Sequence, residues 1–392
     1  MAPKDVLTSI VLEYYKRANL ELPEDMYLRE FALQPMHSSS YVRHLAFRSA
    51  SELRNYILSN VPRHLYFSSA RYRDPSCSDM QAKGWLGSDL VFDIDADHLQ
   101  ACMDKAVELK FCASCGELLN ENDKKCPRCG SSNVVELDYV PKECIYAARD
   151  EMMKLVEAVE QELGYTTYTI AFSGNRGFHL RIQLDGADAL MSGEMRREIV
   201  SYLKLEGIDP TQFMIVEKRR RGKRILTLPP RTKDPGVKGR IARSLLRMVA
   251  SDELACKVIR GETADYRALA RVANSVNAVL MDAIREAAIV VDEKVTMDIS
   301  RLVRIPGSIN GKSGWLCRCV SVNKLQQFEV AEDVVSPIPG AVVEVRLLVS
   351  LPRIRIIDEE VGGKRGDKLR LTSLAALFLA FKGVARIVAI RR

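Results

Sequence analysis

Four cysteines in two close pairs constrain the fold of this chain more than any other feature. Cys112 and Cys115 form the first pair, and after ten intervening residues Cys126 and Cys129 form the second. A glycine follows each pair and permits the tight turn that directs two thiolates toward one ion. Two such turns supply the ligands of a tetrahedral site, so the spacing predicts a zinc ribbon over residues 110–140. Because thiolates fill all four positions, we expect a structural Zn²⁺; a redox dithiol is the alternative.

A short strand with two acids is the second feature. In the strand predicted over residues 89–95, apolar side chains alternate with Asp93 and Asp95, so the two carboxylates lie on one face. At a rise of about 3.3 Å per residue they lie roughly 6.6 Å apart along the backbone, close enough to bind one or two divalent cations. Two acids on an otherwise apolar strand repel each other unless a cation compensates. The alternative is a strand end that runs into a polar turn.

Two glycine-rich segments suit phosphate groups. Residues 173–179 lie between strands predicted over residues 166–172 and 178–184, and their glycines free backbone N–H groups for an anion. Ordinary hairpin chemistry explains this segment equally well. The second segment, residues 301–314, contains Gly311-Lys312-Ser313, a sequence that also occurs in a Walker loop. Only three residues separate Gly307 from that Gly-Lys pair instead of four, so we reject a P-loop NTPase.

The composition is that of an ordinary soluble globular protein, with 47% hydrophobic and 28% charged residues. The longest apolar stretch, residues 371–381, is too short for a membrane span, and the N-terminus lacks the apolar core of a signal peptide. Ten cysteines are too few for a disulfide scaffold in 392 residues, and those outside the zinc motif show no comparable pairing. We therefore expect an intracellular, cytoplasmic protein that does not contact membranes.

Positive charge is concentrated in one segment. The formal net charge is +7, but residues 217–243 contain eleven Lys or Arg against two acids, with the core of the run at residues 218–224. Such a run can hold a polyanion, with an affinity that falls as salt rises. A solvated face or a mobile loop is the alternative.

Hydrophobic periodicity predicts a helical block between regions that contain strands. Residues 184–288 read as helical apart from the basic segment, which we expect to be a loop, and strands resume near Ile289. This arrangement suggests a helical insertion in one domain. Further helices are predicted over residues 6–15, 50–58, 141–163 and 373–382.

The motifs, in their order along the chain, resemble the small catalytic subunit of archaeal and eukaryotic DNA primases, and the archaeal form more closely. The resemblance runs through most of the chain. It is carried by Tyr14-Tyr15, Arg29–Phe31, Tyr41–Phe47, Tyr66–Tyr72, Leu90–Asp97, the four cysteines, Phe172–His179 and Arg301–Ser308.

The resemblance implies an α/β (α+β) fold, in which a mixed-sheet primase catalytic core has an inserted helical subdomain and a zinc ribbon at its side. The implied core comprises residues 1–185 and 286–345 and includes the ribbon. Residues 186–285 form the helical insertion with the basic loop, and residues 346–392 form a C-terminal extension of strands and a helix.

The resemblance also implies an activity: metal-dependent nucleotidyl transfer that synthesises short RNA primers, and often DNA, de novo on single-stranded DNA in replication. The implied cofactors are two Mg²⁺ or Mn²⁺ ions and the structural Zn²⁺. The implied partners are the template, nucleoside triphosphates and a large regulatory subunit that forms a heterodimer with this one. The alternatives are a non-catalytic zinc-ribbon protein that binds nucleic acid, and a related repair or end-joining primase-polymerase.

Matching the family's motifs assigns roles to single residues. Asp93 and Asp95 match two carboxylates that bind the catalytic metals, and Asp292 matches the third, with Asp298 as its rival. At Asn310 the family commonly has histidine; asparagine cannot carry positive charge, so we expect weaker nucleotide contacts there but retained activity. The residues matched to nucleotide binding are Arg43, Ser173, Arg176, His179, Arg304 and Asn310.

Overall fold

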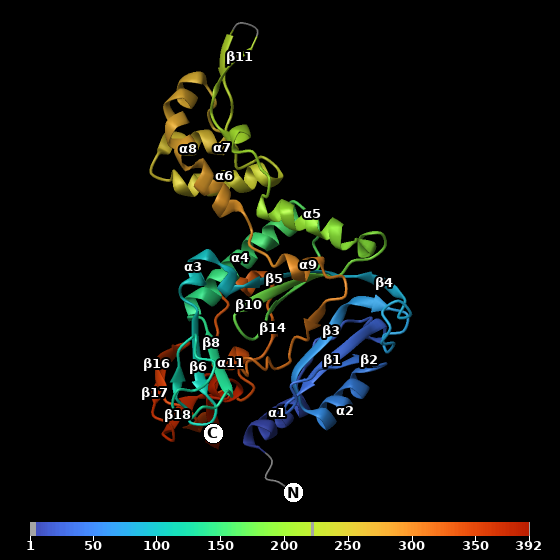
Figure 1. Ribbon diagram of the computed structural model, residues 1–392. Helices are drawn as coiled ribbons and strands as arrows, with labels where there is room; N and C mark the ends of the chain where they lie inside the picture. The colour runs from blue at the N-terminus through green and yellow to red at the C-terminus, as the bar shows by residue number, and fades with distance from the viewer. Residues whose placement is uncertain (1–4, 221–222, 392) are drawn as a thin grey trace. The chain divides into compact units, whose positions relative to one another are not determined.

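The computed structural model describes residues 5–220 and 223–391. The chain divides into two compact units, drawn with the whole chain in Figure 1. The first unit comprises residues 1–152, 167–194 and 292–392, and the second comprises residues 153–166 and 195–291. The fold is mixed α/β, and every strand pairing described is antiparallel. The division into catalytic core, helical insertion and C-terminal extension stays a prediction.

A five-stranded sheet in the first unit has the order β13-β3-β1-β2, and β4 also pairs with β3. Phe31 of this sheet packs edge-on against Phe47, with ring centroids 5.4 Å apart. Phe47 in turn contacts Tyr56 of α2, so this helix covers the sheet through an aromatic chain. The strands are β1 (Arg29–Pro35), β2 (Val42–Leu45), β3 (Pro62–Tyr72), β4 (Trp85–Ser88) and β13 (Leu302–Arg304).

A second, four-stranded sheet has the order β14-β9-β10-β5 and carries the acid strand at its edge. The strand predicted over residues 89–95 is β5, and its register places His179 of β10 opposite Asp93 and Gly177 opposite Asp95. Directly opposite residues of an antiparallel pair project from the same face, so this register brings His179 to the acids. The strands are β5 (Leu90–Asp95), β9 (Tyr168–Phe172), β10 (Gly177–Ile182) and β14 (Arg318–Cys319).

A buried ion pair joins the two sheets. Arg29 of β1 is fully buried and donates a hydrogen bond of 2.8 Å to the carboxylate of Asp89, which directly precedes β5. Arg181 of β10 donates to the same carboxylate at 3.2 Å. Removing one partner of such a buried pair leaves an uncompensated charge, so this network fixes the position of the acid strand.

The helices of the first unit are short apart from α1, α2 and α4. α12 is the apolar helix predicted near the C-terminus, and eight of its nine residues are buried, which explains its apolar surface on every side. No helix in the described part of the chain is long and apolar enough to cross a membrane. The helices are α1 (Val6–Arg17), α2 (Ala50–Asn60), α3 (Gln100–Met103), α4 (Lys142–Gln161, continuing into the second unit), α9 (Glu293–Met297), α10 (Val322–Leu325), α11 (Glu332–Val335) and α12 (Ser373–Phe381).

The cysteine motif lies on a small three-stranded sheet, and the C-terminal residues form two more sheets. The sheet of the cysteine motif has the order β7-β6-β8. In one of the two C-terminal sheets, β15 pairs with both β18 and β19. Four short 3-10 helices span Met26–Leu28, Ala96–His98, Asp188–Leu190 and Pro210–Phe213. The strands are β6 (Val107–Cys112), β7 (Leu118–Leu119), β8 (Val134–Tyr139), β15 (Val342–Leu347), β16 (Leu351–Ile356), β17 (Glu359–Gly363), β18 (Lys368–Thr372) and β19 (Ala385–Arg391).

The second unit is a helical block with its own apolar core, which includes Ile241, Val276 and Leu280. In place of the expected basic loop it has a two-stranded hairpin. The basic run has no alternation of apolar and polar residues, so periodicity could not indicate these strands; Arg221, inside the run, lies outside the described residues. The elements are α5 (Gly193–Lys204, entering from the first unit), α6 (Gly236–Met248), α7 (Glu253–Arg260), α8 (Tyr266–Ala287), β11 (Glu217–Arg220) and β12 (Lys223–Leu226).

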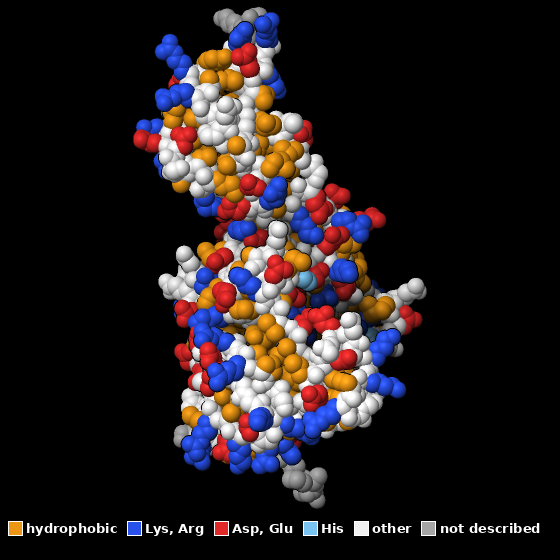
Figure 2. All heavy atoms as spheres, turned by 60° about the vertical axis from the view of Figure 1, so that its left-hand side comes forward, with side chains coloured by type: hydrophobic (Ala, Val, Ile, Leu, Met, Phe, Trp, Pro, Cys, Tyr) orange, Lys and Arg blue, Asp and Glu red, His pale blue; other side chains and the backbone are white. Residues whose placement is uncertain are grey.

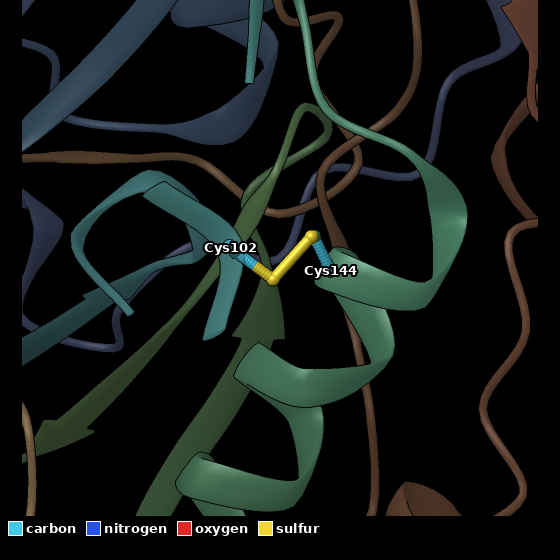
Figure 3. Close-up of a disulfide and its surroundings, with 2 residues drawn as sticks. All are labelled: Cys102 and Cys144. Atoms are coloured by element: carbon cyan, nitrogen blue, oxygen red, sulfur yellow. A yellow bond between two sulfur atoms is a disulfide. The ribbon is translucent and has the colours of Figure 1, made fainter. Parts of the chain in front are cut away.

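A disulfide joins Cys102 of α3 to Cys144 of α4 (Figure 3). Both cysteines are buried, and their Cα atoms lie 5.7 Å apart. This bridge was not predicted, because the cysteines outside the zinc motif show no paired spacing. Their separation of 42 residues carries no motif, and only the approach of α3 to α4 brings the thiols together.

Candidate active site

A cavity of about 190 Å³ in the first unit has both Asp93 and Asp95 in its wall. Basic and acidic groups thus share one small enclosure, which suits an anionic ligand held beside cations. The other charged or imidazole side chains in its wall are Arg176, His179, Arg301, Arg304 and Lys312.

Asp93 and His179 form a close pair across β5 and β10. Their Oδ1 and Nδ1 atoms lie 2.8 Å apart, but Asp93 Oδ1 is buried without a hydrogen bond of acceptable geometry among the described residues. Burial alone would lower the pKa of His179, yet the Asp93 carboxylate overrides burial and raises it. Burial alone would raise the pKa of Asp93, and the imidazolium reverses that effect and lowers it. The pair therefore favours a carboxylate beside a protonated imidazole.

Asp95 has the opposite electrostatic character. Burial, and then repulsion from the nearby Asp93 carboxylate, raise the pKa of Asp95 to about 6. Gly177 lies opposite it in the register, and a Cβ on Gly177 would collide with Asp95 Oδ1. The glycine is thus required because the carboxylate lies against the β10 backbone. An acid with a raised pKa beside a second acid is the arrangement that a divalent cation stabilises.

The loop between β9 and β10 is closed by Ser173. Its backbone N–H donates to the carbonyl of Gly177 at 2.8 Å, and its hydroxyl accepts from the N–H groups of Asn175 and Gly177. Gly174 has a φ of +78°, a left-handed conformation that glycine adopts without strain. These contacts hold Asn175, Arg176 and His179 along one wall of the cavity.

Arg176 connects the cavity to residues 107–139, which contain β6, β7, β8 and the four cysteines and are called the cysteine module below. Its guanidinium forms an ion pair of 2.7 Å with Asp97, just beyond β5, and one of 3.5 Å with Asp138 of β8. Asp138 also pairs with Lys382 at 2.5 Å. The charge of Arg176 is therefore shared between two acids.

Arg304 is held in place by aromatic and imidazole groups. It is 8% exposed, donates to the Tyr66 hydroxyl at 2.8 Å, and lies over the Tyr66 ring at 4.7 Å. Its Nη1 also lies 2.9 Å from His64 Nδ1. Burial, reinforced by Arg304 and neighbouring cations, lowers the pKa of His64 to about 2, so His64 stays neutral and accepts the bond. The guanidinium is thus preorganised at the cavity wall.

Asn310 joins the two glycine-rich segments. Its Nδ2 donates to the carbonyl of Ser173 at 2.8 Å, and its Oδ1 accepts from the N–H of Lys312 at 3.0 Å. The residue is 4% exposed and lines the cavity. An imidazole at this position would have to replace both bonds, so asparagine here positions the loop of Ser173.

The third acid lies next to the pair but is not in the cavity wall. The backbone N–H of Asp292 donates to the carbonyl of Asp93 at 2.9 Å, while its carboxylate caps α9 through the N–H of Val295 at 3.2 Å. The carboxylate of the rival, Asp298, accepts two bonds from Ser300. The backbone contact to Asp93 favours Asp292 over Asp298.

Arg43 is the other matched residue outside the cavity wall. It forms an ion pair of 3.0 Å with Glu30, whose buried carboxylate also pairs with the buried Lys83 at 2.6 Å. In this arrangement Arg43 balances charge on the first sheet.

Three basic or aromatic residues of the cavity wall were not assigned a role from the sequence. These are Tyr66, Arg301 and Lys312. Arg301 and Tyr66 occur in motifs that carry the resemblance, and Lys312 belongs to the Gly-Lys-Ser turn. A sequence shows that these residues are basic or aromatic, but only the folded chain shows that they line one cavity with the acids: Tyr66 and Arg301 through the pairing of β13 with β3, and Lys312 from the turn that follows.

The four cysteines form one compact group. Their sulfur atoms all lie within 4.8 Å of one another, and no other group of three or more potential ligands in the described residues meets that criterion. Gly116 and Gly130 both have φ near +74°, and their N–H groups donate to the carbonyls of Cys112 and Cys126 at 2.8 Å. Each pair therefore forms the expected tight turn, and the group can hold a metal such as zinc.

Comparisons with known proteins agree with this arrangement of motifs. The family model of the DNA primase small subunit matches residues 135–322. The DNA primase small subunit PriS of Hyperthermus butylicus is 35% identical, over 98% of this chain and 97% of the relative. The chain belongs to the DNA primase small-subunit family. PriS proteins of Staphylothermus marinus and Saccharolobus solfataricus are each 34% identical over 98% of the chain, covering 95% and 96% of their own lengths.

The acids suit the divalent cations that primases use. Asp93 offers a buried carboxylate, whose Oδ1 has no well-aligned hydrogen bond to a described residue although His179 Nδ1 lies 2.8 Å away, and hard oxygen ligands are those that Mg²⁺ and Mn²⁺ prefer. Asp95 adds a second carboxylate at the same wall, on the same strand face. The donor set of this primase family member therefore fits a divalent cation.

Proposed function

We propose that this chain is the catalytic subunit of a DNA primase, which synthesises short RNA primers, and also DNA, de novo on single-stranded DNA. The observation that carries the proposal is the shared cavity, whose wall contains the acid pair together with Arg176, His179 and Arg304. Membership of the primase small-subunit family supports it. A non-catalytic zinc-ribbon protein would have no use for a buried carboxylate pair in which the pKa of one member, Asp95, is raised.

We assign metal binding to Asp93, Asp95 and Asp292. When bound, Mg²⁺ or Mn²⁺ would lower the pKa of the attacking 3′-hydroxyl and neutralise charge on the pyrophosphate leaving group. Asp93 and Asp95 would offer oxygens from one strand. Asp292 would need to exchange its capping bond to α9 for the metal, which its backbone contact to Asp93 makes a short movement.

The triphosphate is assigned to the basic side chains of the same cavity. His179, kept protonated by Asp93, can donate from Nε2 to a phosphate oxygen, because its Nδ1 faces the carboxylate. Arg304 offers a preorganised guanidinium, and Arg176 a second one that must first leave an acid. Arg43 and Asn310 would act at the edge of the site, with Ser173 closing the loop that presents backbone N–H groups.

The remaining partners follow from the family. We propose that the cysteine group holds a structural Zn²⁺, and that a large regulatory subunit binds this chain as a heterodimer. A repair or end-joining primase-polymerase is the second candidate, but no feature of the described residues favours it over the replicative enzyme.

Primer synthesis with labelled nucleotides on single-stranded DNA tests the proposal. Asp93→Ala with Asp95→Ala should abolish the product in both Mg²⁺ and Mn²⁺. As a matched control, Asp104→Ala with Glu108→Ala removes two exposed carboxylates outside the cavity and should leave the product unchanged. An undiminished product from the first variant would refute the assignment of these acids.

A further inference from the structure

The hairpin of β11 and β12 concentrates positive charge at one end of the helical unit. Residues 217–226 contain six Lys or Arg and one acid. The hairpin projects from the helices, and blue Lys and Arg side chains gather at that end in Figure 2. Among its described side chains, Lys218, Arg219 and Arg224 are all exposed. Neither Lys218 nor Arg219 has an ion pair with any described residue, and the single acid, Glu217, lies 3.5 Å from Arg224.

The strand register sets like charges against each other. Arg219 lies directly opposite Arg224, so both side chains project from one face of the hairpin. Like charges directly opposite on an antiparallel pair are destabilising, and a two-stranded hairpin is marginally stable in water even without them. A hairpin selected only for its own stability would not carry this pair. A bound polyanion would convert the repulsion into attraction.

The base of the hairpin is firmly attached to its unit. Asn277 of α8 clamps the backbone of Ile215 with two bonds of 2.9 Å, donating to its carbonyl and accepting from its N–H. The Tyr266 hydroxyl, at the start of α8, donates to Glu217 at 2.8 Å, and the Thr227 hydroxyl donates to the carbonyl of Met214 at 2.7 Å. These contacts offset the weakness of the isolated hairpin and fix its base on α8.

We propose that this hairpin binds the phosphate backbone of double-stranded nucleic acid, as a contact separate from the catalytic cavity. The site comprises Lys218, Arg219 and Arg224. It extends the proposed primase function, but its test measures binding alone, so either proposal can fail without the other.

The form of the hairpin favours a duplex over a single strand. Proteins that hold single strands combine positive charge with aromatic side chains on which bases stack. Residues 217–226 contain no aromatic residue, and Tyr266, which contacts the hairpin, has its hydroxyl bound to Glu217. A two-stranded ribbon has the width that a duplex groove accepts, and Lys and Arg on it reach phosphates on both sides.

The test measures binding of the full-length chain to a labelled mixed-sequence DNA duplex. Fluorescence anisotropy reports the affinity at each of a range of salt concentrations. Lys218→Ala with Arg219→Ala should weaken duplex binding. It should also reduce the slope of log affinity against log salt by about 1.8, because each phosphate contact contributes about 0.9. Between about 50 and 200 mM salt the wild type should therefore lose roughly tenfold more affinity than the variant.

A matched control removes two cations of the same unit that are already neutralised. Lys257 pairs with Glu253 and Arg285 with Asp282, each at 2.7 Å, so Lys257→Ala with Arg285→Ala should leave duplex affinity unchanged. The proposal is overturned if the hairpin variant keeps the wild-type slope, or if the control loses as much affinity. It is equally overturned if the hairpin variant loses affinity for a single strand of the same length but not for the duplex.

Discussion

Breaking the disulfide between Cys102 and Cys144 should destabilise the first unit measurably. The cysteines are 42 residues apart, and the bridge closes a loop that contains the whole cysteine module, including β6 and β8. For a loop of this length, the entropy that a cross-link removes from the unfolded chain corresponds to about 4 kcal/mol at 25 °C. This is an upper value, because unfolded chains retain some structure and the reduced thiols still pack.

Tryptophan fluorescence reports on this unit selectively. The chain has two tryptophans, Trp85 and Trp315, and both belong to the first unit. Urea unfolding followed by this signal should show a lower midpoint for wild type in a phosphine reductant than without it. The variant Cys102→Ala with Cys144→Ala should resemble reduced wild type and should not respond to the reductant.

Thiol chemistry provides the decisive control. Alkylation of the urea-unfolded, unreduced protein should leave Cys102 and Cys144 unmodified and should label free cysteines such as Cys77 and Cys256. If both members of the pair are alkylated without reductant, the bridge is absent and the reasoning fails. An equal response of wild type and variant to the reductant would also contradict it, by placing the effect at other thiols.

Four further predictions concern the cavity and the metal group. Gly177→Ala should lower primer synthesis on the order of 100-fold, because the new Cβ displaces the Asp95 carboxylate; an unimpaired rate would contradict the close approach. Without added divalent cation, Asp95→Asn should stabilise the chain by up to about 3 kcal/mol above pH 6, since burial raises the pKa of Asp95 to about 6 and its ionised form therefore destabilises the fold. That gain should shrink as pH falls from about 6 toward 4 in urea unfolding, and a gain independent of pH would exclude the titration as its cause. Cys115→Ala should remove bound zinc as measured by elemental analysis, and retention of one zinc per chain would show that the group is not the site. Asn310→Ala should raise the nucleotide KM, because the buried carbonyl of Ser173 loses its bond at a cost of about 1–3 kcal/mol; an unchanged KM would separate this bond from nucleotide binding.

The elements with regular periodicity could be predicted from the sequence. The helix expected over residues 141–163 is α4, Lys142–Gln161, and the strand expected over residues 89–95 is β5. Both patterns are local. An apolar stripe identifies the buried face of a helix, and alternating apolar residues identify the buried face of a strand. The cysteine group could also be predicted from the sequence, because the spacing of the cysteines identifies metal ligands on tight turns.

Features that depend on distant segments could not be read in this way. The pairing of Asp93 with His179 follows from a register between strands that are far apart in the sequence. The disulfide forms only because α3 lies beside α4. The strands of the hairpin lie in a basic segment without alternation of apolar and polar residues, so no sequence pattern indicated them. For Asp292, the sequence indicated a carboxylate, whereas its capping of α9 required the fold.

The two ion pairs of Arg176 have a consequence for communication within the first unit. A triphosphate that recruits this guanidinium must compete with Asp97 and Asp138, so nucleotide arrival would free Asp138 to rely on Lys382 alone. Asp138 belongs to β8, the strand that returns from the cysteine module. Under the proposed assignment of Arg176 to the triphosphate, this one arginine would couple occupancy of the cavity to the cysteine module, and the state of that module would in turn affect nucleotide affinity.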